Sequence, residues 1–224
     1  KGRTHEDLRG SPYDLAIEEI TRRSIEAWDR GATEVCLQGG IHPDYTGATY
    51  ETICRAIKAV EPDLHIHAFS PLEIWQGAHT LGVSLADMLR ELKAAGLSSL
   101  PGTAAEILDD EVRRRISRLK CSTAEWVEVH RAAHGLGMRT TATMMFGHIE
   151  SRADRVEHMR MLRDLQDRTG GFTAFIGWTF QPGNTELGGQ EATTAEYLRT
   201  MAVARIFLDN IRNIQASWVT QGSK

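Results

Sequence analysis

Residues 33–43, TEVCLQGGIHP, are the stretch from which the rest of the chain is best interpreted. A short apolar strand, Glu34 to Leu37, runs directly into Gln38 and the pair Gly39-Gly40. Glycines let a backbone approach a ligand that a side chain would keep away. In alternating α/β folds, ligands bind at the carboxyl ends of the strands. The stretch therefore predicts a strand that ends in a ligand-binding turn.

Strand-like and helix-like segments alternate along the remaining sequence. Strands are predicted at residues 34–37, 64–69, 97–100, 139–146, 172–180 and 214–219. Helical patterns fill the intervals, and hydroxyl residues mark helix starts near Ser122, Ser151 and Thr193. This alternation predicts parallel strands with right-handed crossovers. About six strands favour a barrel-like or partial-barrel sheet over a doubly wound one.

The composition is that of one globular domain. The 224 residues are 41% hydrophobic and 25% charged, which is enough for one sizeable core. The formal net charge is -4 and the basic residues are scattered, which argues against a nucleic-acid partner. No apolar run reaches the roughly 20 residues of a membrane span, and the first residues contain no signal-peptide core. A cytoplasmic protein without a membrane partner is predicted.

The three cysteines, Cys36, Cys54 and Cys121, lie far apart without metal-ligand spacing. An odd count fits a reducing compartment better than a disulfide framework. Buried structural thiols are the expectation for Cys36 and Cys54.

Polar side chains recur on or just past the predicted strands, although parallel strands covered on both faces normally read as apolar. These residues are Gln38, His65, His67, Ser70, Glu73, Thr103, Glu106, Thr141, Thr143, His148, Gln181, Asn184, Gln215 and Ser217. A half-barrel lining that binds a polar ligand explains the recurrence.

Each of these residues also has a purely structural interpretation. Threonine is a common strand former, and two histidines on one strand face are more often satisfied core groups. Glu73 and Glu106 are equally compatible with helix capping. Taken alone, the residues predict a cytosolic, barrel-like enzyme with a polar cavity and do not name its reaction.

Long motifs carry a more specific resemblance. They are EVCLQGGIHPDYTG, HIHAFSPLE, SLPGTAAEILDDEVR, RTTATMMFGH, FQPGNTEL and NIQASWVTQG. These segments resemble the radical S-adenosylmethionine (SAM) enzymes of the deazaflavin and menaquinone pathways. That group includes FO synthase subunit 2 and cyclic dehypoxanthine futalosine synthase. The resemblance implies a partial (β/α)6 TIM-like barrel of the radical SAM type.

The two halves of the chain resemble different members of this group. The first half is similar to FO synthase subunit 2, a 4-hydroxyphenyl transferase that joins a tyrosine-derived fragment to 5-amino-6-(D-ribitylamino)uracil. The second half is more similar to the futalosine cyclase, and Ala174 stands where the FO subunit usually has Glu. The resemblance implies carbon–carbon bond formation of the FO type, with the futalosine cyclase as the alternative.

The family holds a [4Fe-4S] cluster with a Cys-x-x-x-Cys-x-x-Cys motif, which this sequence lacks. The start KGRTHEDLRG resembles the segment just after that motif. Residues 1–224 are thus expected to be a single barrel domain truncated at both ends, with the first strand and cluster loop missing. The expectation is that this chain alone neither holds the cluster nor turns over. The full-length protein would use the cluster and SAM to generate a 5'-deoxyadenosyl radical.

The resemblance also assigns roles to individual residues. It implies that Gln38, Gly39 and Gly40 meet the methionyl amino group of SAM, with His65, Ser70 and Glu106 on the cofactor side. It places Thr141, Thr143, Gln181, Asn184, Gln215 and Ser217 on the substrate side. His148 is the candidate for proton handling. The implied partners are a small-molecule substrate, a second radical SAM subunit or domain, and an external electron donor.

A different class stays open at this point. A metal-independent (β/α) barrel lyase or hydrolase would use Glu106 or His148 as acid or base, and would be active in these 224 residues. A non-catalytic binding remnant would bind a ligand without turnover.

Overall fold

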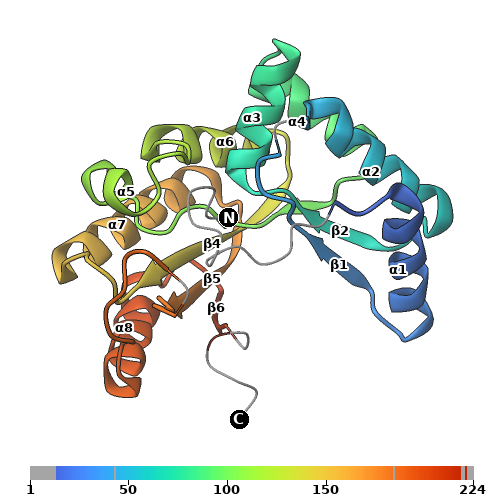
Figure 1. Cartoon of the computed structure of the whole chain (residues 1–224). Helices are drawn as coiled ribbons and strands as arrows, with labels where there is room; N and C mark the ends of the chain where they lie inside the picture. The colour runs from blue at the N-terminus through green and yellow to red at the C-terminus, as the bar shows by residue number, and fades with distance from the viewer. Residues whose placement is uncertain (1–13, 43, 184, 218–219, 221–224) are drawn as a thin grey trace.

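The computed structural model describes residues 14–42, 44–183, 185–217 and 220. Six parallel strands form one sheet in the order β1-β2-β3-β4-β5-β6. The strands are β1 Glu34–Leu37, β2 His65–Ala68, β3 Ser99–Leu100, β4 Arg139–Phe146, β5 Phe172–Thr179 and β6 Asn213–Ala216. The sheet curls, and the helices form an arc on its convex side (Figure 1). The predicted partial barrel is confirmed as a half-barrel.

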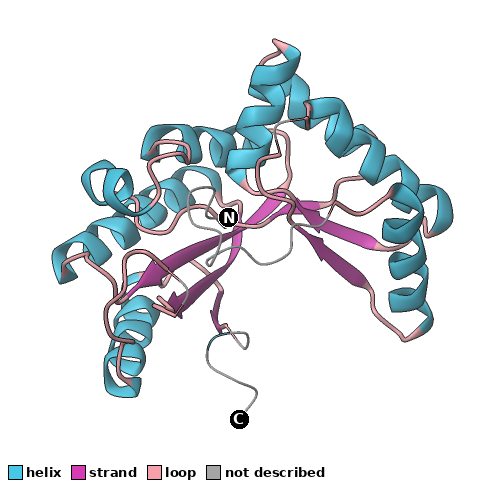
Figure 2. Cartoon of the chain, in the orientation of Figure 1, coloured by secondary structure: helices cyan, strands magenta, loops and turns pink. Residues whose placement is uncertain are grey.

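The helices alternate with the strands (Figure 2). They are α1 Ile17–Asp29, α2 Gly47–Val60, α3 Pro71–Leu81, α4 Leu85–Ala94, α5 Asp110–Ile116, α6 Thr123–Gly135, α7 Arg152–Thr169 and α8 Thr194–Phe207. The helical region predicted after Ser70 is two helices, because Gly82 ends α3 in the left-handed conformation and Ser84 caps α4. The short helix α5 is not among the elements predicted from the sequence.

Side-chain caps explain why the helices begin where the sequence predicted. Ser122 and Ser151 each complete a capping box, and Thr193 accepts a hydrogen bond from Glu196 N. The strand predicted at residues 214–219 ends earlier, at Ala216, and Trp218 and Val219 lie outside the described residues.

The alternation of side chains along β2 separates the core from the concave face. Ile66 and Ala68 are fully buried and pack with the helices in a cluster that also contains Ile57 and Leu89. Since successive side chains point to opposite faces, His65 and His67 lie on the concave side. A second cluster fills the space between β4, β5 and helices α6 to α8. The predicted polar strand residues His65, His67, Thr141 and Thr143 therefore lie on the inside of the half-barrel, whereas Thr140 faces α6.

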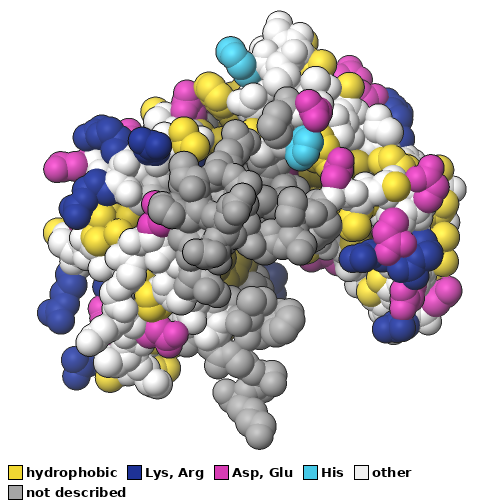
Figure 3. Space-filling view, viewed as in Figure 1, with side chains coloured by type: hydrophobic (Ala, Val, Ile, Leu, Met, Phe, Trp, Pro, Cys, Tyr) yellow, Lys and Arg dark blue, Asp and Glu magenta, His cyan; other side chains and the backbone are white. Residues whose placement is uncertain are grey.

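On the face drawn in Figure 3, blue and magenta side chains of described residues intermingle on the flanks and form no continuous basic stripe. No helix in the described part of the chain is long and apolar enough to cross a membrane.

Candidate active site

The loop after β1 is held by one buried carboxylate. Glu73 Oε1 accepts hydrogen bonds from Gly39 N at 2.8 Å and Gly40 N at 3.1 Å. Glu73 Oε2 accepts from Ser70 N and Ser70 Oγ. Glu73 thus caps α3, as its structural interpretation predicted, and also fixes the glycine loop. The Ser70 hydroxyl is used inside the capping box.

The donors and acceptors of this loop decide which ligand groups it can bind. Both glycine N–H groups are taken by Glu73, so an anion finds no free donor there. No described residue donates a hydrogen bond to the carbonyl groups of residues 38–40. Gly40 has φ +67°, which a residue with a Cβ adopts only with strain. The loop therefore offers backbone acceptors that suit an ammonium group.

A cavity of about 360 Å³ adjoins this loop along the outer edge of β1. Its polar lining residues are Arg23, Ser24, Gln38, Gly39, His42 and Tyr45. The apolar lining residues include Leu15, Ile20, Val35 and Ile53. The size is that of small-molecule sites, and the polar groups of the lining could orient a ligand.

The hydroxyls of Thr141 and Thr143 both bind the backbone of Gly102, in the loop after β3. Gly102 N donates to Thr141 Oγ1 at 3.1 Å, and Thr143 Oγ1 donates to Gly102 O at 2.6 Å. A Cβ at Gly102 would lie 2.4 Å from Thr141 O, so the loop can approach β4 only because residue 102 is glycine. The two threonines line the concave side, but their hydroxyls are already engaged.

The next part of the same loop contains Glu106 in a left-handed conformation. Ala104 and Glu106 have φ values of 64° and 47°, and the similarly strained Phe69 (φ 63°) follows β2. Such strain clusters at functional sites and must be held by surrounding contacts. Glu106 forms an ion pair with Lys120, and its carbonyl accepts from Met145 N at 2.9 Å.

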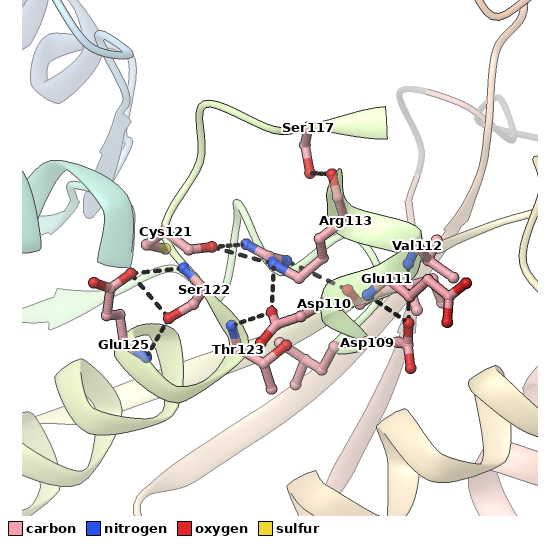
Figure 4. Close-up of polar contacts among 12 residues, drawn as sticks. Asp109, Asp110, Glu111, Val112, Arg113, Ser117, Cys121, Ser122, Thr123 and Glu125 are labelled. Atoms are coloured by element: carbon pink, nitrogen blue, oxygen red, sulfur yellow. Dashed lines mark hydrogen bonds and ion pairs between the residues drawn. The ribbon is translucent and has the colours of Figure 1, made fainter. Parts of the chain in front are cut away.

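Arg113 of α5 supplies the contacts that hold this loop, and Figure 4 shows its guanidinium against Cys121 and beside Asp110. Its guanidinium is 4% exposed and donates to the carbonyl oxygens of Ala104, Ala105, Ile107 and Cys121. Asp110 lies beside it and accepts from Thr123 N, at the start of α6. A guanidinium with five fixed donors is well suited to several carbonyls at once.

His148 is buried in the loop after β4. Its side chain and that of Glu150 are both 0% exposed, and His148 Nδ1 lies 3.1 Å from Glu150 Oε2. His148 Nε2 is 3.2 Å from Met145 O. Burial lowers the pKa of His148, while the charge of Glu150 opposes that shift. Arg155 continues the network by bridging Glu150 and Glu196.

His65 lies far from the glycine loop. Glu34 is its register partner, and Glu34 precedes Gly39 by five residues, about 16 Å along an extended strand. His65 Nε2 and His67 Nδ1 each lie 2.7 Å from Ser99 Oγ. The structure thus places His65 at the amino ends of the strands, opposite the remaining cofactor-side candidates.

The other substrate-side candidates follow β5 and β6. Gln181 Nε2 donates to Thr179 Oγ1 at 3.2 Å. Gln215 is exposed in β6 on the face opposite Ile214, which packs into the second core cluster. Ser217 follows that strand, and Asn184 lies outside the described residues. Gln181, Gln215 and Ser217 therefore come from the last two strands, away from Gly39.

The cysteines do not fit an iron–sulfur cluster. Cys36 lies on β1, Cys54 in α2 and Cys121 just before α6. Burial raises the pKa of Cys54 to about 12 and that of Cys121 to about 11, whereas cluster ligands are thiolates. The prediction that Cys54 is a buried thiol is confirmed. The same prediction for Cys36 is wrong, because Cys36 is exposed on the edge strand β1.

Sequence reasoning missed Arg113, Lys120 and Ser99. The bonds of Arg113 reach six to nine residues back or forward, across a loop without periodic pattern. Ser99 stands in the predicted strand LSSL, and its place between two histidines depends on the pairing of β2 with β3. The sequence signal that could have pointed to Ser99 is a polar residue inside a short buried strand.

The fold and the site define an α/β half-barrel whose strained loops and glycine turn gather at the carboxyl ends of parallel strands. A family model described as the Radical SAM superfamily matches residues 3–162, and the chain belongs to that superfamily. A second model, the CofH/MqnC C-terminal region, matches residues 169–224. The resemblance found in the sequence is confirmed.

Curated relatives are similar along nearly the whole chain. The 5-amino-6-(D-ribitylamino)uracil–L-tyrosine 4-hydroxyphenyl transferase 1 of Methanosarcina acetivorans is 47% identical, covering 94% of this chain and 58% of that protein. The transferase of Methanosphaerula palustris is 48% identical, covering 95% and 60%. The cyclic dehypoxanthine futalosine synthase of Streptomyces coelicolor is 46% identical, covering 93% and 52%. The chain thus spans little more than half the length of these relatives.

Proposed function

We propose that this chain forms the barrel of a radical SAM transferase that joins the 4-hydroxyphenyl group of L-tyrosine to 5-amino-6-(D-ribitylamino)uracil. The observation that carries the proposal is the 47% identity with a relative of that name over 94% of the chain. The half-barrel with polar side chains on its concave face supports it, since such a lining suits a polar small molecule.

In this proposal the loop of Gln38, Gly39 and Gly40 receives the methionyl amino group of SAM. The support is chemical, because Glu73 takes the loop N–H groups and leaves carbonyl acceptors for an ammonium. When bound, SAM supplies radical chemistry in this superfamily. The chain's own contribution is to orient the cofactor. Glu73 contributes to this by holding the glycine loop through the N–H groups of Gly39 and Gly40.

The substrate would lie against the later strands. Gln215 and Ser217 offer polar groups on or just past β6, and Gln181 does so after β5. Thr141 and Thr143 act indirectly in this proposal, because they hold Gly102 and so shape the wall of the site. His148 keeps its proton-handling role as a prediction.

The test uses the gene product with any sequence that flanks these 224 residues, reconstituted anaerobically with iron, sulfide, SAM and a reductant. It is offered tyrosine with 5-amino-6-(D-ribitylamino)uracil, and separately dehypoxanthine futalosine, and the products are identified by mass. A tyrosine–uracil adduct is the expected result. If reconstituted protein with intact iron–sulfur absorption gives neither product, the proposal is wrong.

A second candidate is the futalosine cyclase. Two observations favour it: the 46% identity with a relative of that name, and the small side chain of Ala174, which is buried in β5 beside Thr141. A cyclised futalosine product in the same assay would select this function.

A further inference from the structure

Three metal-ligating side chains lie together at the amino ends of β1 and β2, away from the glycine loop. One donor atom from each of Glu34, His65 and His67 lies within 4.8 Å of the other two. The strand pairing sets this arrangement, because Glu34 is the register partner of His65. His67 follows on the same face, since side chains alternate along a strand.

The distances within this triad are close to those of a metal site. His65 Nε2 and Glu34 Oε2 are 3.6 Å apart. Two ligands of a tetrahedral Zn²⁺ lie about 3.3 Å apart when each is about 2.0 Å from the metal. Ser99 Oγ lies 2.7 Å from a nitrogen of each histidine. One nitrogen of each imidazole thus points to the same position, which is occupied by the Ser99 hydroxyl.

Two side chains of the triad are accessible, and no described lysine or arginine neutralises its negative charge. The side chains of Glu34 and His65 are 53% and 43% exposed. Among the residues that the structure describes, no lysine or arginine forms an ion pair with Glu34. The buried Glu73 and Glu150 differ, because backbone N–H groups or Arg155 occupy their oxygens. Within the described part of the chain, the carboxylate of Glu34 therefore keeps its charge available to a cation on the concave side.

We propose that Glu34, His65 and His67 bind one divalent transition-metal ion of the Zn²⁺ type, with water completing the coordination. Two imidazoles and one carboxylate form a donor set suited to Zn²⁺, Co²⁺ or Fe²⁺. Because the ligands come from adjacent strands at the amino ends of the barrel, the metal ties β1 to β2 and stabilises the fold. This inference is independent of the proposed reaction.

The test is a titration of the chain, expressed without a histidine tag, with Co²⁺ alone. The visible absorption of bound Co²⁺ reports its coordination, and Zn²⁺ should displace it. One saturable equivalent is expected. Glu34→Gln and His67→Gln should each weaken binding by more than about tenfold, since even groups that only orient ligands contribute about 10- to 100-fold. His79→Gln, at an exposed histidine of α3, is the control and should bind as the unchanged chain does.

Ser99→Ala gives a further check. Its hydroxyl competes for both imidazoles, so its removal should preserve or tighten Co²⁺ binding. Loss of binding in Ser99→Ala would contradict the assignment of ligands. No saturable binding, or equal binding by Glu34→Gln and His67→Gln, would overturn the site.

Thermal unfolding supplies a readout that needs no spectroscopic metal. Zn²⁺ should raise the unfolding temperature of the unchanged chain and of His79→Gln, and leave that of Glu34→Gln unchanged. Glu34 is exposed, so this variant is expected to fold even where His67→Gln does not. An equal shift in Glu34→Gln would show that Zn²⁺ binds elsewhere.

Discussion

Glu73 Oε1 accepts a 2.8 Å hydrogen bond from Gly39 N, which lies 34 residues earlier in the chain. The bond joins the first turn of α3 to the loop after β1. Since Glu73 is fully buried, its carboxylate cannot exchange these partners for water without moving the helix start. The geometry of the glycine loop therefore depends on how α3 begins.

Glu73→Ala should destabilise the fold more than an ordinary loss of a helix cap. The matched control is Glu125→Ala, because Glu125 forms the same capping box with Ser122 and does not contact the glycine loop. We expect about 1 kcal/mol for the control and about 3 kcal/mol for Glu73→Ala, which empties a fully buried side-chain position. It also leaves the buried Ser70 N–H and the part-buried N–H groups of Gly39 and Gly40 without their acceptor. Urea unfolding measures the stability of both variants. Equal losses of unfolding free energy would mean that the bonds of Glu73 to Gly39 and Gly40 contribute nothing to stability.

Gly102→Ala should be poorly tolerated. The added Cβ would lie 2.4 Å from Thr141 O and 2.7 Å from Ala142 Cα, and these backbone atoms belong to a central strand. We expect a cost of about 3 kcal/mol, as for other forced overpacking. Gly135→Ala is the control: a Cβ there meets no atom within 4 Å, and the position is helical. Thermal unfolding of both variants checks the difference, and a neutral Gly102→Ala would disprove the close approach.

Arg113→Met should loosen the loop that carries Glu106. The variant removes the donors to the carbonyls of Ala104 and Cys121 while keeping an apolar stem of similar length. Because these contacts are buried, we expect a loss of more than about 3 kcal/mol. Arg114→Met changes an exposed neighbour and should stay within about 0.5 kcal/mol of the parent. Urea unfolding of the two variants measures the difference. Equal midpoints for Arg113→Met and Arg114→Met would contradict the role of Arg113 in holding the loop.

The elements that could be predicted from the sequence are those fixed by local signals. β1 and β4 have the predicted bounds, and Ser122 and Ser151 cap the predicted helices, because periodicity and capping act within a few residues. The polar lining of the concave face was also visible in the sequence. The partners of Glu73 and Arg113 could not be predicted from the sequence, because they are set by strand order and loop packing.

The buried histidines should make the fold acid-sensitive. Burial lowers the pKa of His134 to about 4 and that of His158 to about 3, and it lowers the pKa of the fully buried His130 well below its usual value. As pH falls below about 6.5, the unfolded chain binds protons that the folded chain excludes, so stability decreases. The loss continues down to the folded-state pKa values.

We expect each of these histidines to remove up to about 1.4 kcal/mol per pH unit in that window. Urea unfolding at about pH 7 and about pH 5 measures the loss. His134→Gln should reduce the slope, whereas His79→Gln, at an exposed position, should leave it unchanged. Stability that is flat between these pH values would show that the buried histidines accept protons without cost.

His148 and Glu150 should prove energetically coupled. Their fully buried side chains lie 3.1 Å apart, and Glu150 also accepts from the N–H groups of Gly147 and His148. His148→Gln should therefore cost about 2 kcal/mol of stability, and the double variant with Glu150→Gln should cost less than the sum of the two single variants. If the stability losses of the two single variants add up to that of the double variant, the contact between His148 and Glu150 does not contribute to stability. If His148 handles a proton in the reconstituted enzyme, His148→Gln should remove its ionisation from the pH profile of turnover. Glu150→Gln removes a charge that raises the pKa of His148, so it should instead shift that profile to lower pH.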